Sequence, residues 1–346
     1  MQGKPIRVAV VGVGHLGREH ARIYRDLPGI ELTAVVDVNE STAAAVAKKH
    51  KTQAITDYRK LAGLVDAVSV VVPTILHHEV ATWFLDHGVH VLVEKPIART
   101  TVEAMDMVAR GERTGALLAV GHVERFNPAV MAVRRMGIRP LFIDSQRISP
   151  FPSRSADVGV VLDLLIHDLD IILWFVDGAP ISRIDALGVG VLGELEDIAN
   201  ARITFENGVV ANATASRVSL KRERKIRIFG DDCYVSLDYE ARRAKLYKKS
   251  PELKLEKFNV QKLGPKALLE LKDLIFGKLV QVEDVKMPDH EPLAKEIEAF
   301  IDCVRTGQTP LVDGRHGLRA LEGAERSVGA IRENLAAQGR NPMGER

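Results

Sequence analysis

Short continuous apolar runs alternate with longer amphipathic segments over residues 6–122. Continuous apolar runs are typical of strands buried on both faces of a parallel sheet, and they predict strands at 6–11, 32–36, 66–72, 89–93 and 117–120. The segments between them predict helices at 16–26, 40–50, 77–87 and 101–112. Strands and helices that alternate in this way indicate βαβ units and a doubly wound parallel sheet, an α/β fold.

The pattern changes after residue 122. Helices are predicted at 128–136 and 160–176, with a strand at 141–148 between them. Residues 181–247 contain six short strand-like runs without a helical segment, separated by turn signals such as Asn207-Gly208. A helix is predicted at 267–276, and two more, at 293–305 and 316–338, close the chain. We therefore expect an α+β domain with a mostly antiparallel open sheet in this half.

The composition is that of an ordinary folded protein. The chain has 346 residues, 46% hydrophobic and 27% charged, which suffices for two domains of usual size. Lysine and arginine number 48 against 46 acidic residues, which argues against nucleic-acid binding through bulk charge. No apolar run reaches the roughly 18 residues of a membrane helix, and the start lacks a signal-peptide pattern. Cys233 and Cys303 form no metal or redox motif. We expect a soluble cytoplasmic enzyme that binds neither nucleic acid nor membrane.

The first predicted strand leads into a glycine-rich turn, Gly12-Val13-Gly14-His15-Leu16-Gly17, where a helix is predicted to begin. This spacing is typical of dinucleotide binding, because the glycines permit a tight turn, close approach of a pyrophosphate and packing of the helix on the strand. Asp37 ends the next strand, where a carboxylate binds ribose hydroxyls and repels a 2′-phosphate. No arginine follows it directly, so the pattern favours NAD over NADP. The alternative is a glycine-rich turn in a domain that binds no nucleotide.

Glu94, Lys95 and Pro96 follow another buried strand, at the sheet edge where ligands of such folds bind. The ammonium group of Lys95 is therefore expected near the nicotinamide, where it can bind a substrate hydroxyl and stabilise the oxygen as charge develops. The alternative is a surface lysine that merely ends a strand.

The segment 160–176 is almost entirely apolar, yet Asp163, His167 and Asp170 recur at the spacing of one helix face. Buried polar groups are costly without partners or a task, and a histidine between two carboxylates suits general acid–base catalysis. Alternatively, Asp163 complements the helix dipole and His167 is a satisfied core histidine. A metal site is the least favoured hypothesis, because no further ligand cluster accompanies these residues.

Two weaker signals concern substrate binding. Arg125 and Asn127 follow the last predicted strand of the first half and are expected to line its crevice; the alternative is a hinge with Asn127 as a helix cap. The basic run at 217–225 is a candidate for binding a phosphorylated substrate. The alternative for this run is a solvated strand end or a subunit interface.

Together these residues resemble the glucose–fructose oxidoreductase/inositol dehydrogenase/rhizopine catabolism (Gfo/Idh/MocA) family over almost the whole chain. The shared motifs are the glycine-rich turn, Asp37, Pro73 with His77, Glu94-Lys95-Pro96, and Asp163 with His167. The resemblance implies an NAD-binding Rossmann domain at 1–122 and a substrate-binding α/β domain with C-terminal helices at 123–346. It also implies that Lys95, Asp163 and His167 act on the substrate. The chain departs from the common DxGxH form of the family, because Leu165 replaces the glycine.

Three longer stretches, GHVERFNPAV, VLDLLIHDLDI and TASRVSLKRERKIRIF, resemble a bacterial subgroup, the UDP-N-acetylglucosamine 3-dehydrogenases. This resemblance implies NAD-dependent oxidation of the C3 hydroxyl of a UDP-sugar, for an amino sugar of lipid A or a surface polysaccharide. It further implies a homo-oligomer, a dimer or tetramer formed through the C-terminal sheet. Two alternatives stay open: a free-sugar or cyclitol dehydrogenase, and a non-catalytic NAD-sensing regulator.

The expected site contains no metal, and its catalytic residues are Lys95, Asp163 and His167. The residues expected to bind NAD are Gly12, Gly14, His15, Leu16, Gly17, Asp37, Pro73, Thr74, His77, Glu94 and Lys95. The residues expected to bind the substrate are Lys95, Arg125, Asn127, Asp163 and His167.

Overall fold

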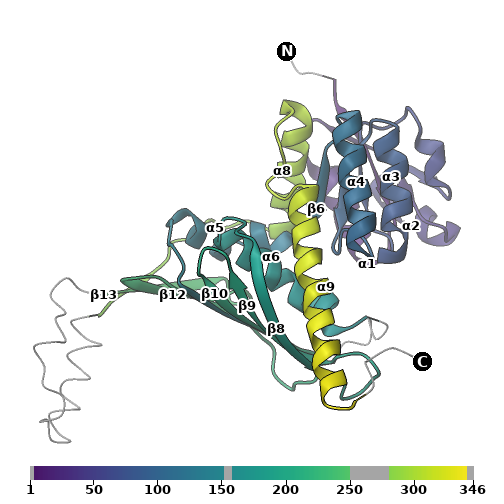
Figure 1. Ribbon diagram of the computed structural model, residues 1–346. Coiled ribbons are helices and arrows are strands. Elements are labelled where there is room, and N and C mark those ends of the chain that lie inside the picture. The colour runs from purple at the N-terminus through teal and green to yellow at the C-terminus, as the bar shows by residue number, and fades with distance from the viewer. Residues whose placement is uncertain (1–3, 152–157, 250–279, 341–346) are drawn as a thin grey trace, which may run out of the picture. The chain divides into compact units, whose positions relative to one another are not determined.

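The computed structural model of the protein describes residues 4–151, 158–249 and 280–340. The chain forms two compact units (Figure 1). The N-terminal unit comprises Met1–Phe126 and His290–Arg326, and the C-terminal unit comprises Asn127–Asp289 and Ser327–Arg346. Residues 290–326 therefore fold with the N-terminal unit, although the sequence division at residue 122 assigns them to the second domain. The helix predicted at 267–276 lies outside the described residues.

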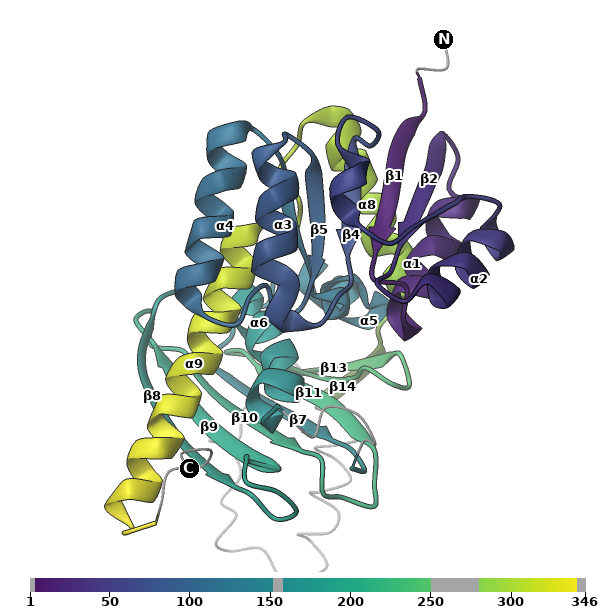
Figure 2. The ribbon, with the colours of Figure 1, turned by 90° about the vertical axis from the view of Figure 1, so that its right-hand side faces the viewer.

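The N-terminal unit contains a six-stranded sheet in the order β3-β2-β1-β4-β5-β6, with every neighbouring pair parallel (Figure 2). Its strands are β1 (Ile6–Val11), β2 (Ile30–Val36), β3 (Gln53–Ile55), β4 (Ala67–Val70), β5 (His90–Glu94) and β6 (Leu118–Gly121). Its main helices are α1 (His15–Asp26), α2 (Glu40–His50), α3 (His77–Asp86), α4 (Thr101–Thr114) and α8 (Pro292–Thr306). The strand order reverses between β1 and β4, which is where ligands bind in doubly wound folds. The short edge strand β3 carries no apolar run and was not predicted.

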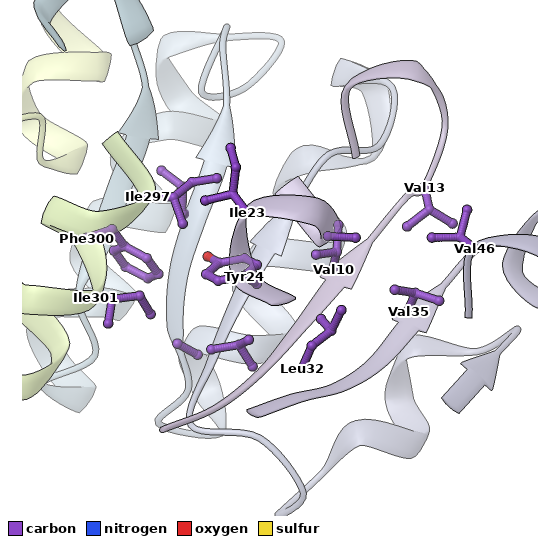
Figure 3. Close-up of a cluster of buried hydrophobic side chains, with 14 of the residues drawn as sticks. Val10, Val13, Ile23, Tyr24, Leu32, Val35, Val46, Ile297, Phe300 and Ile301 are labelled. Carbon is purple, nitrogen blue, oxygen red and sulfur yellow. The ribbon is translucent and has the colours of Figure 1, made fainter. Parts of the chain in front are cut away.

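Helix α8 belongs to the N-terminal unit because it packs on α1 and completes the hydrophobic core there. Its residues Ile297, Phe300 and Ile301 are spaced to lie on one helical face and are buried. They join a cluster that includes Tyr24 and Ile23 of α1 (Figure 3). The apolar face of α8 thus covers a surface of the Rossmann unit, and its position late in the sequence does not determine its domain.

The C-terminal unit contains an eight-stranded sheet in the order β14-β13-β12-β11-β7-β10-β9-β8. Only β7 and β10 pair in parallel; the other neighbours are antiparallel, which confirms the predicted class. Its strands are β7 (Phe142–Ile148), β8 (Ile181–Val189), β9 (Ile198–Phe205), β10 (Val210–Ser216), β11 (Glu223–Phe229), β12 (Cys233–Asp238), β13 (Arg243–Lys249) and β14 (Val280–Asp284). Strand β14, largely exposed and partly acidic, was not predicted.

Helices α5 (Pro128–Arg135) and α6 (Ile166–Phe175) pack on one face of this sheet, α6 against β7 and β10 and α5 against β12 and β13. Helix α9 (Gly314–Ala337) contributes residues to both units. None of the helices in the described ranges combines the length and apolar character needed to cross a membrane.

Candidate active site

Each of the three glycines in the turn after β1 is explained by a different feature of the structure. Gly12 has a φ of +88°, and a Cβ there would lie 2.4 Å from the carbonyl oxygen of Val71. A Cβ on Gly17 would lie 1.9 Å from the carbonyl oxygen of Gly12, so helix and turn could not pack as closely. A Cβ on Gly14 would meet nothing within 4 Å. The fold therefore requires Gly12 and Gly17, whereas Gly14 keeps an outward-facing stretch of backbone bare.

Gly14 is also the N-cap of α1, and it makes no side-chain capping hydrogen bond. The first N–H groups of a helix lack partners within the helix, and together with the helix dipole they favour an anion. A bare backbone at such a helix start fits the pyrophosphate of a dinucleotide.

A cavity of about 380 Å³ lies at the carboxyl ends of β1, β2 and β4. It is lined by Val11, Gly12, Gly14, Val36, Asp37, Val38, Thr56, Tyr58, Val71, Val72, Pro73, Leu76, Glu79 and Val80. The Asp37 carboxylate accepts hydrogen bonds from the backbone amides of Val13 (3.1 Å) and Asn39 (2.9 Å), which fix it at the cavity wall. Mostly apolar walls, with the Asp37 carboxylate held at the end of β2, fit the adenine and ribose of NAD.

Tyr58 and Glu79 of this wall interact with each other and were not among the residues predicted from the sequence. The Tyr58 hydroxyl donates to Glu79 Oε1 (3.0 Å), and the guanidinium of Arg59 lies 4.6 Å from the Tyr58 ring centroid. Burial, together with the hydrogen bond to Glu79, raises the pKa of Tyr58 to about 12, so its hydroxyl stays protonated. No motif marks either residue, because they come from separate segments that meet only in the fold.

Of the predicted NAD residues, Gly12, Gly14, Asp37 and Pro73 line the cavity. The others lie outside its lining: His15, Leu16, Gly17, Thr74, His77, Glu94 and Lys95. His15 and Leu16 are exposed in the first turn of α1.

His77 is enclosed by protein and tied to the backbone. Its ring is 1% exposed, with Nδ1 2.8 Å from the Pro96 carbonyl oxygen and Nε2 2.9 Å from that of Val72. A carbonyl only accepts, so a neutral ring can donate to one of the two and a protonated ring to both. Burial lowers the pKa of His77, against the opposing effect of the two carbonyls. The ring thus holds together the segments that follow β4 and β5.

Lys95 is half-buried immediately after β5, and the Lys95–Pro96 peptide bond is cis. The preceding residue, Glu94, turns its carboxylate inward rather than toward the cavity. Glu94 Oε1 lies 3.2 Å from His20 Nε2, and Glu94 Oε2 accepts from the Lys95 backbone amide (3.3 Å). The lysine predicted to act on the substrate therefore follows a side chain that is itself fixed within the unit.

In the C-terminal unit, the predicted helix at 160–176 has an unexpected first turn. Residues Val161–Leu165 form a π-helix, which continues into α6. The Glu196 carboxylate accepts from the Val161 amide (3.2 Å) and fills the space next to Gly159. A π turn at the start of a helix is frequent at functional sites, and here it contains Asp163.

Asp163, His167 and Asp170 do not share one environment, although helical spacing placed them on one face. Asp163 and His167 are half-buried, whereas Asp170 is completely buried. The wider π turn changes the angular spacing between residue 163 and the helix that follows. Asp163 and His167 are the half-buried polar residues of this segment, beside the half-buried Leu162, Leu164 and Trp174.

Two buried ion pairs brace this segment. Arg147 on β7 binds Asp168, next to His167, through two nitrogens (2.7 and 3.3 Å), and both side chains are at most 2% exposed. Arg217 binds Asp197 (2.8 Å) and donates to the Val158 carbonyl (2.5 Å), just before the π turn. Burial alone raises the pKa of Asp197, but hydrogen bonds from backbone amides and from Arg217 lower it below its ordinary value.

The weaker substrate candidates are buried. Arg125 is 1% exposed and donates to the Leu311 carbonyl (3.3 Å). Asn127 caps α5 by accepting from the Ala129 amide (3.1 Å), which is the alternative that the sequence left open. Arg217, the first residue of the basic run, is committed to Asp197. Within the described part of the chain, no group of three or more histidine, cysteine or acidic side chains is arranged to hold a metal.

A parallel doubly wound sheet, a glycine turn at a helix start and a fixed carboxylate at the end of β2 define an NAD-binding dehydrogenase domain. The chain belongs to the Gfo/Idh/MocA oxidoreductase family, which confirms the resemblance seen in the sequence. Residues 6–122 match the NAD-binding Rossmann fold of the oxidoreductase family, and residues 153–335 match its C-terminal alpha/beta domain. The protein is an NAD-dependent oxidoreductase whose relatives act on CH–OH groups.

The chain is similar to three proteins of known name. It is 34% identical to UDP-N-acetylglucosamine 3-dehydrogenase of Acidithiobacillus ferrooxidans over 92% of this chain and 95% of that one. The solved structure of that enzyme superposes with a TM-score of 0.84, covering 95% and 99% of the two chains. Scyllo-inositol 2-dehydrogenase (NAD(+)) of Bacillus subtilis is 26% identical over 96% of both chains. The WlbA dehydrogenase of Bordetella pertussis, solved with NADH and UDP-GlcNAcA, shares the fold at 20% identity (TM-score 0.78, 96% and 97% covered).

Proposed function

We propose that this protein oxidises a secondary hydroxyl, that on C3, of a UDP-sugar such as UDP-N-acetylglucosamine. The observation that carries the proposal is the 34% identity, over almost the full length, to a UDP-N-acetylglucosamine 3-dehydrogenase. Such a reaction in the cytoplasm yields a 3-keto sugar for the synthesis of an amino sugar of lipid A or a surface polysaccharide. The inositol dehydrogenase relative, at 26% identity, makes a cyclitol the second candidate substrate.

The proposed chemistry assigns roles to Lys95, Asp163 and His167. His167 removes the hydroxyl proton, and Asp163, four residues earlier and likewise half-buried, orients it. Lys95 stabilises the oxygen as the C–H bond breaks and the carbonyl forms; the reverse assignment, with Lys95 as the base, is the alternative. NAD, when bound, supplies the hydride acceptor. Both assignments require all three side chains, which argues against a regulator that only senses NAD.

The test is an absorbance trace of NADH formation with NAD and UDP-N-acetylglucosamine, followed by mass analysis of the sugar. A parallel reaction contains 2-oxoglutarate, so that a tightly held cofactor can be recycled. The proposal expects a sugar product lighter by two hydrogens. Absence of this product from protein shown to bind NAD excludes the substrate, and free sugars and cyclitols are then assayed in the same way.

His167→Ala separates catalysis from cofactor binding. The variant is expected to lose turnover while its dissociation constant for NAD stays within about twofold, because His167 belongs to the other unit of the chain. Retained turnover would remove His167 from the mechanism and leave Lys95 as the base.

We further propose a homo-oligomer formed through the C-terminal sheet. On the face of this sheet opposite α5 and α6, aromatic rings from β7, β11, β12 and β13 form a ladder: Phe142, Phe229, Tyr234 and Tyr247. Neighbouring ring centroids lie 4.3–5.7 Å apart. A dimer or tetramer in light scattering, converted to monomer by Tyr234→Glu, is the expected result; a wild-type monomer contradicts it.

A further inference from the structure

A chain of polar side chains crosses the buried centre of the N-terminal unit, among mostly apolar core residues. It links Tyr24 and His20 of α1, Ser69 of β4 and Glu94 of β5. The Tyr24 hydroxyl lies 2.8 Å from Ser69 Oγ, which lies 3.0 Å from His20 Nδ1. His20 Nε2 lies 3.2 Å from Glu94 Oε1. Tyr24, Ser69 and His20 are all 0% exposed.

We propose that His20 is a positioning residue of this oxidoreductase: through the Glu94 carboxylate it fixes the backbone of Lys95 at the end of β5. The inference rests on the proposed role of Lys95 in the reaction. It assigns a purpose to three polar residues, the buried His20 and Ser69 and the half-buried Glu94, that do not line the NAD cavity.

The direction of the hydrogen bond between His20 and Glu94 follows from chemistry. An ionised carboxylate only accepts, so His20 Nε2–H is the donor, and Nδ1 faces the Ser69 hydroxyl, which can donate or accept. The second Glu94 oxygen accepts from the Lys95 amide (3.3 Å). Each carboxylate oxygen therefore has a defined partner, one from α1 and one from the residue to be positioned.

The third constraint on Glu94 is steric. A Cβ on Gly121 of β6 would lie 2.9 Å from the Glu94 carboxyl carbon and both its oxygens. The carboxylate thus packs against bare backbone and is only 12% exposed. With His20, Gly121 and the Lys95 amide on three sides, the Glu94 side chain has little freedom to swing.

A buried histidine by itself contributes little to the stability of a core. Buried polar groups gain little over apolar residues of similar volume, and they lose heavily when a partner is missing. The benefit of the His20–Glu94 pair is geometric: it ties the N–H of Lys95, and with it the start of the lysine side chain, to the helix that follows the glycine turn. Reacting groups must be held within a fraction of an ångström, so loss of this tie is expected to lower kcat.

Two substitutions of His20 differ in the hydrogen bond that they keep. His20→Gln places an amide nitrogen near the position of Nε2 and can still donate to Glu94. His20→Asn reaches only the position of Nδ1 and can still contact Ser69. We expect His20→Asn to lower kcat at least tenfold, with the dissociation constant for NAD within threefold of wild type, and His20→Gln to restore kcat to within threefold. Equal losses in both variants, in proportion to their thermal midpoints, would overturn the proposal.

A second readout needs neither substrate nor cofactor. In the NAD-free protein, the Lys95 amide, whose partner is the Glu94 side chain, is expected to exchange with deuterium at least tenfold faster in His20→Asn than in wild type or His20→Gln. The matched control is His90→Asn on the same strand, because the His90 side chain accepts from the Leu117 amide (2.9 Å) at the opposite end of β5 from Glu94. Unchanged exchange in His20→Asn would refute the link.

The exchange measurement keeps this inference separate from the proposed function. If no sugar substrate is found but His20→Asn speeds exchange at Lys95, the positioning link stands and the assigned reaction fails. If the variants change neither exchange nor the kcat of an active enzyme, the link itself fails. Glu94→Gln is the second variant, and it is expected to speed exchange at Lys95 because an amide oxygen accepts more weakly than a carboxylate.

Discussion

The two units support their candidate catalytic residues by different means. In the N-terminal unit, Lys95 follows a glutamate held by the buried ring of His20 and precedes a carbonyl bound by His77. In the C-terminal unit, the segment with Asp163 and His167 is braced by arginine–aspartate pairs that are 0–2% exposed. One unit thus relies on hydrogen bonds to side-chain rings, and the other on full charges taken out of water.

This difference predicts how substitutions in each unit affect the protein. When one partner of a buried ion pair is removed, the remaining charge has lost both water and counter-charge, and the folded state is strongly destabilised. When His20 is replaced, the Glu94 carboxylate keeps the Lys95 amide and part of its exposure to water, so the cost is expected to be smaller. Substitutions in the arginine–aspartate pairs of the C-terminal unit are therefore expected mainly to lower stability. Substitutions in the hydrogen-bond chain of the N-terminal unit are expected mainly to misplace Lys95.

The largest expected effect is on the Arg147–Asp168 pair. Arg147→Met leaves the Asp168 carboxylate buried without its counter-charge, so we expect a loss of about 3–5 kcal/mol in the free energy of unfolding. The double variant Arg147→Met/Asp168→Leu is expected to recover most of that loss, because no charge then remains buried. Urea unfolding followed by circular dichroism measures both.

The matched control is the exposed pair Arg183–Asp185, whose side chains are 72% and 52% exposed. Arg183→Met is expected to change stability by less than about 0.5 kcal/mol. A double variant at 147 and 168 that is as unstable as the single variant would show that the pair matters through shape rather than charge.

The Asp197–Arg217 pair gives a pH-dependent effect of intermediate size. The pKa of Asp197 is lowered in the folded protein, so its contribution is present above its unfolded pKa, about 3.9, and is lost as pH falls through the folded value. Asp197→Asn is expected to cost about 2–3 kcal/mol at pH 7, the strength of a charge-assisted hydrogen bond. The difference from wild type should shrink below pH 4 in unfolding curves recorded from pH 7 to 3. A difference independent of pH contradicts the assignment.

A smaller effect separates ligand binding from folding within the N-terminal unit. Gly14→Ala adds a methyl group where nothing lies within 4 Å, so the thermal midpoint is expected to stay within a degree or two. NAD binding should weaken by at least tenfold, about 1.4 kcal/mol, because the methyl group occupies the approach of the pyrophosphate. Gly17→Ala is the contrasting variant, since its Cβ would collide with the Gly12 carbonyl and cost about 1–3 kcal/mol of stability. Isothermal titration and thermal scans distinguish them.

Much of the fold could be predicted because apolar periodicity is local. Residues 6–11 and 40–50 form a strand and a helix with the predicted bounds, and the glycine turn lies between strand and helix as expected. The prediction was weakest where a distant residue decides local structure. The π turn at Val161–Leu165 is held by Glu196, more than thirty residues later in the sequence. The α-helical spacing of Asp163 and His167 gives no indication of a π turn.

The supports of the site could not be found in the sequence for a related reason. Periodicity shows which positions are buried, but it does not pair a buried histidine with a carboxylate 74 residues away, as in His20 and Glu94. Asp168 lies inside a motif that the sequence singled out, yet only the fold shows that it binds Arg147 rather than lining the site. Motifs therefore indicate candidate reacting groups, and three-dimensional pairing determines what holds them.

The smallest expected effect tests whether the Tyr24 hydroxyl, at the far end of the hydrogen-bond chain, helps to position Lys95. Tyr24→Phe removes the hydroxyl 2.8 Å from Ser69 Oγ but leaves the ring packed against α8, so the loss of stability is expected to be about 0.5–1.5 kcal/mol. Ser69 keeps its contact with His20, and His20 keeps its bond to Glu94. Exchange at the Lys95 amide should therefore match wild type in the same deuterium experiment, whereas His20→Asn changes it. Faster exchange in Tyr24→Phe would show that the hydrogen bonds from Tyr24 through Ser69 and His20 to Glu94 all help to position Lys95. The N-terminal unit would then hold its lysine by a longer and more cooperative network than the ion pairs of the C-terminal unit.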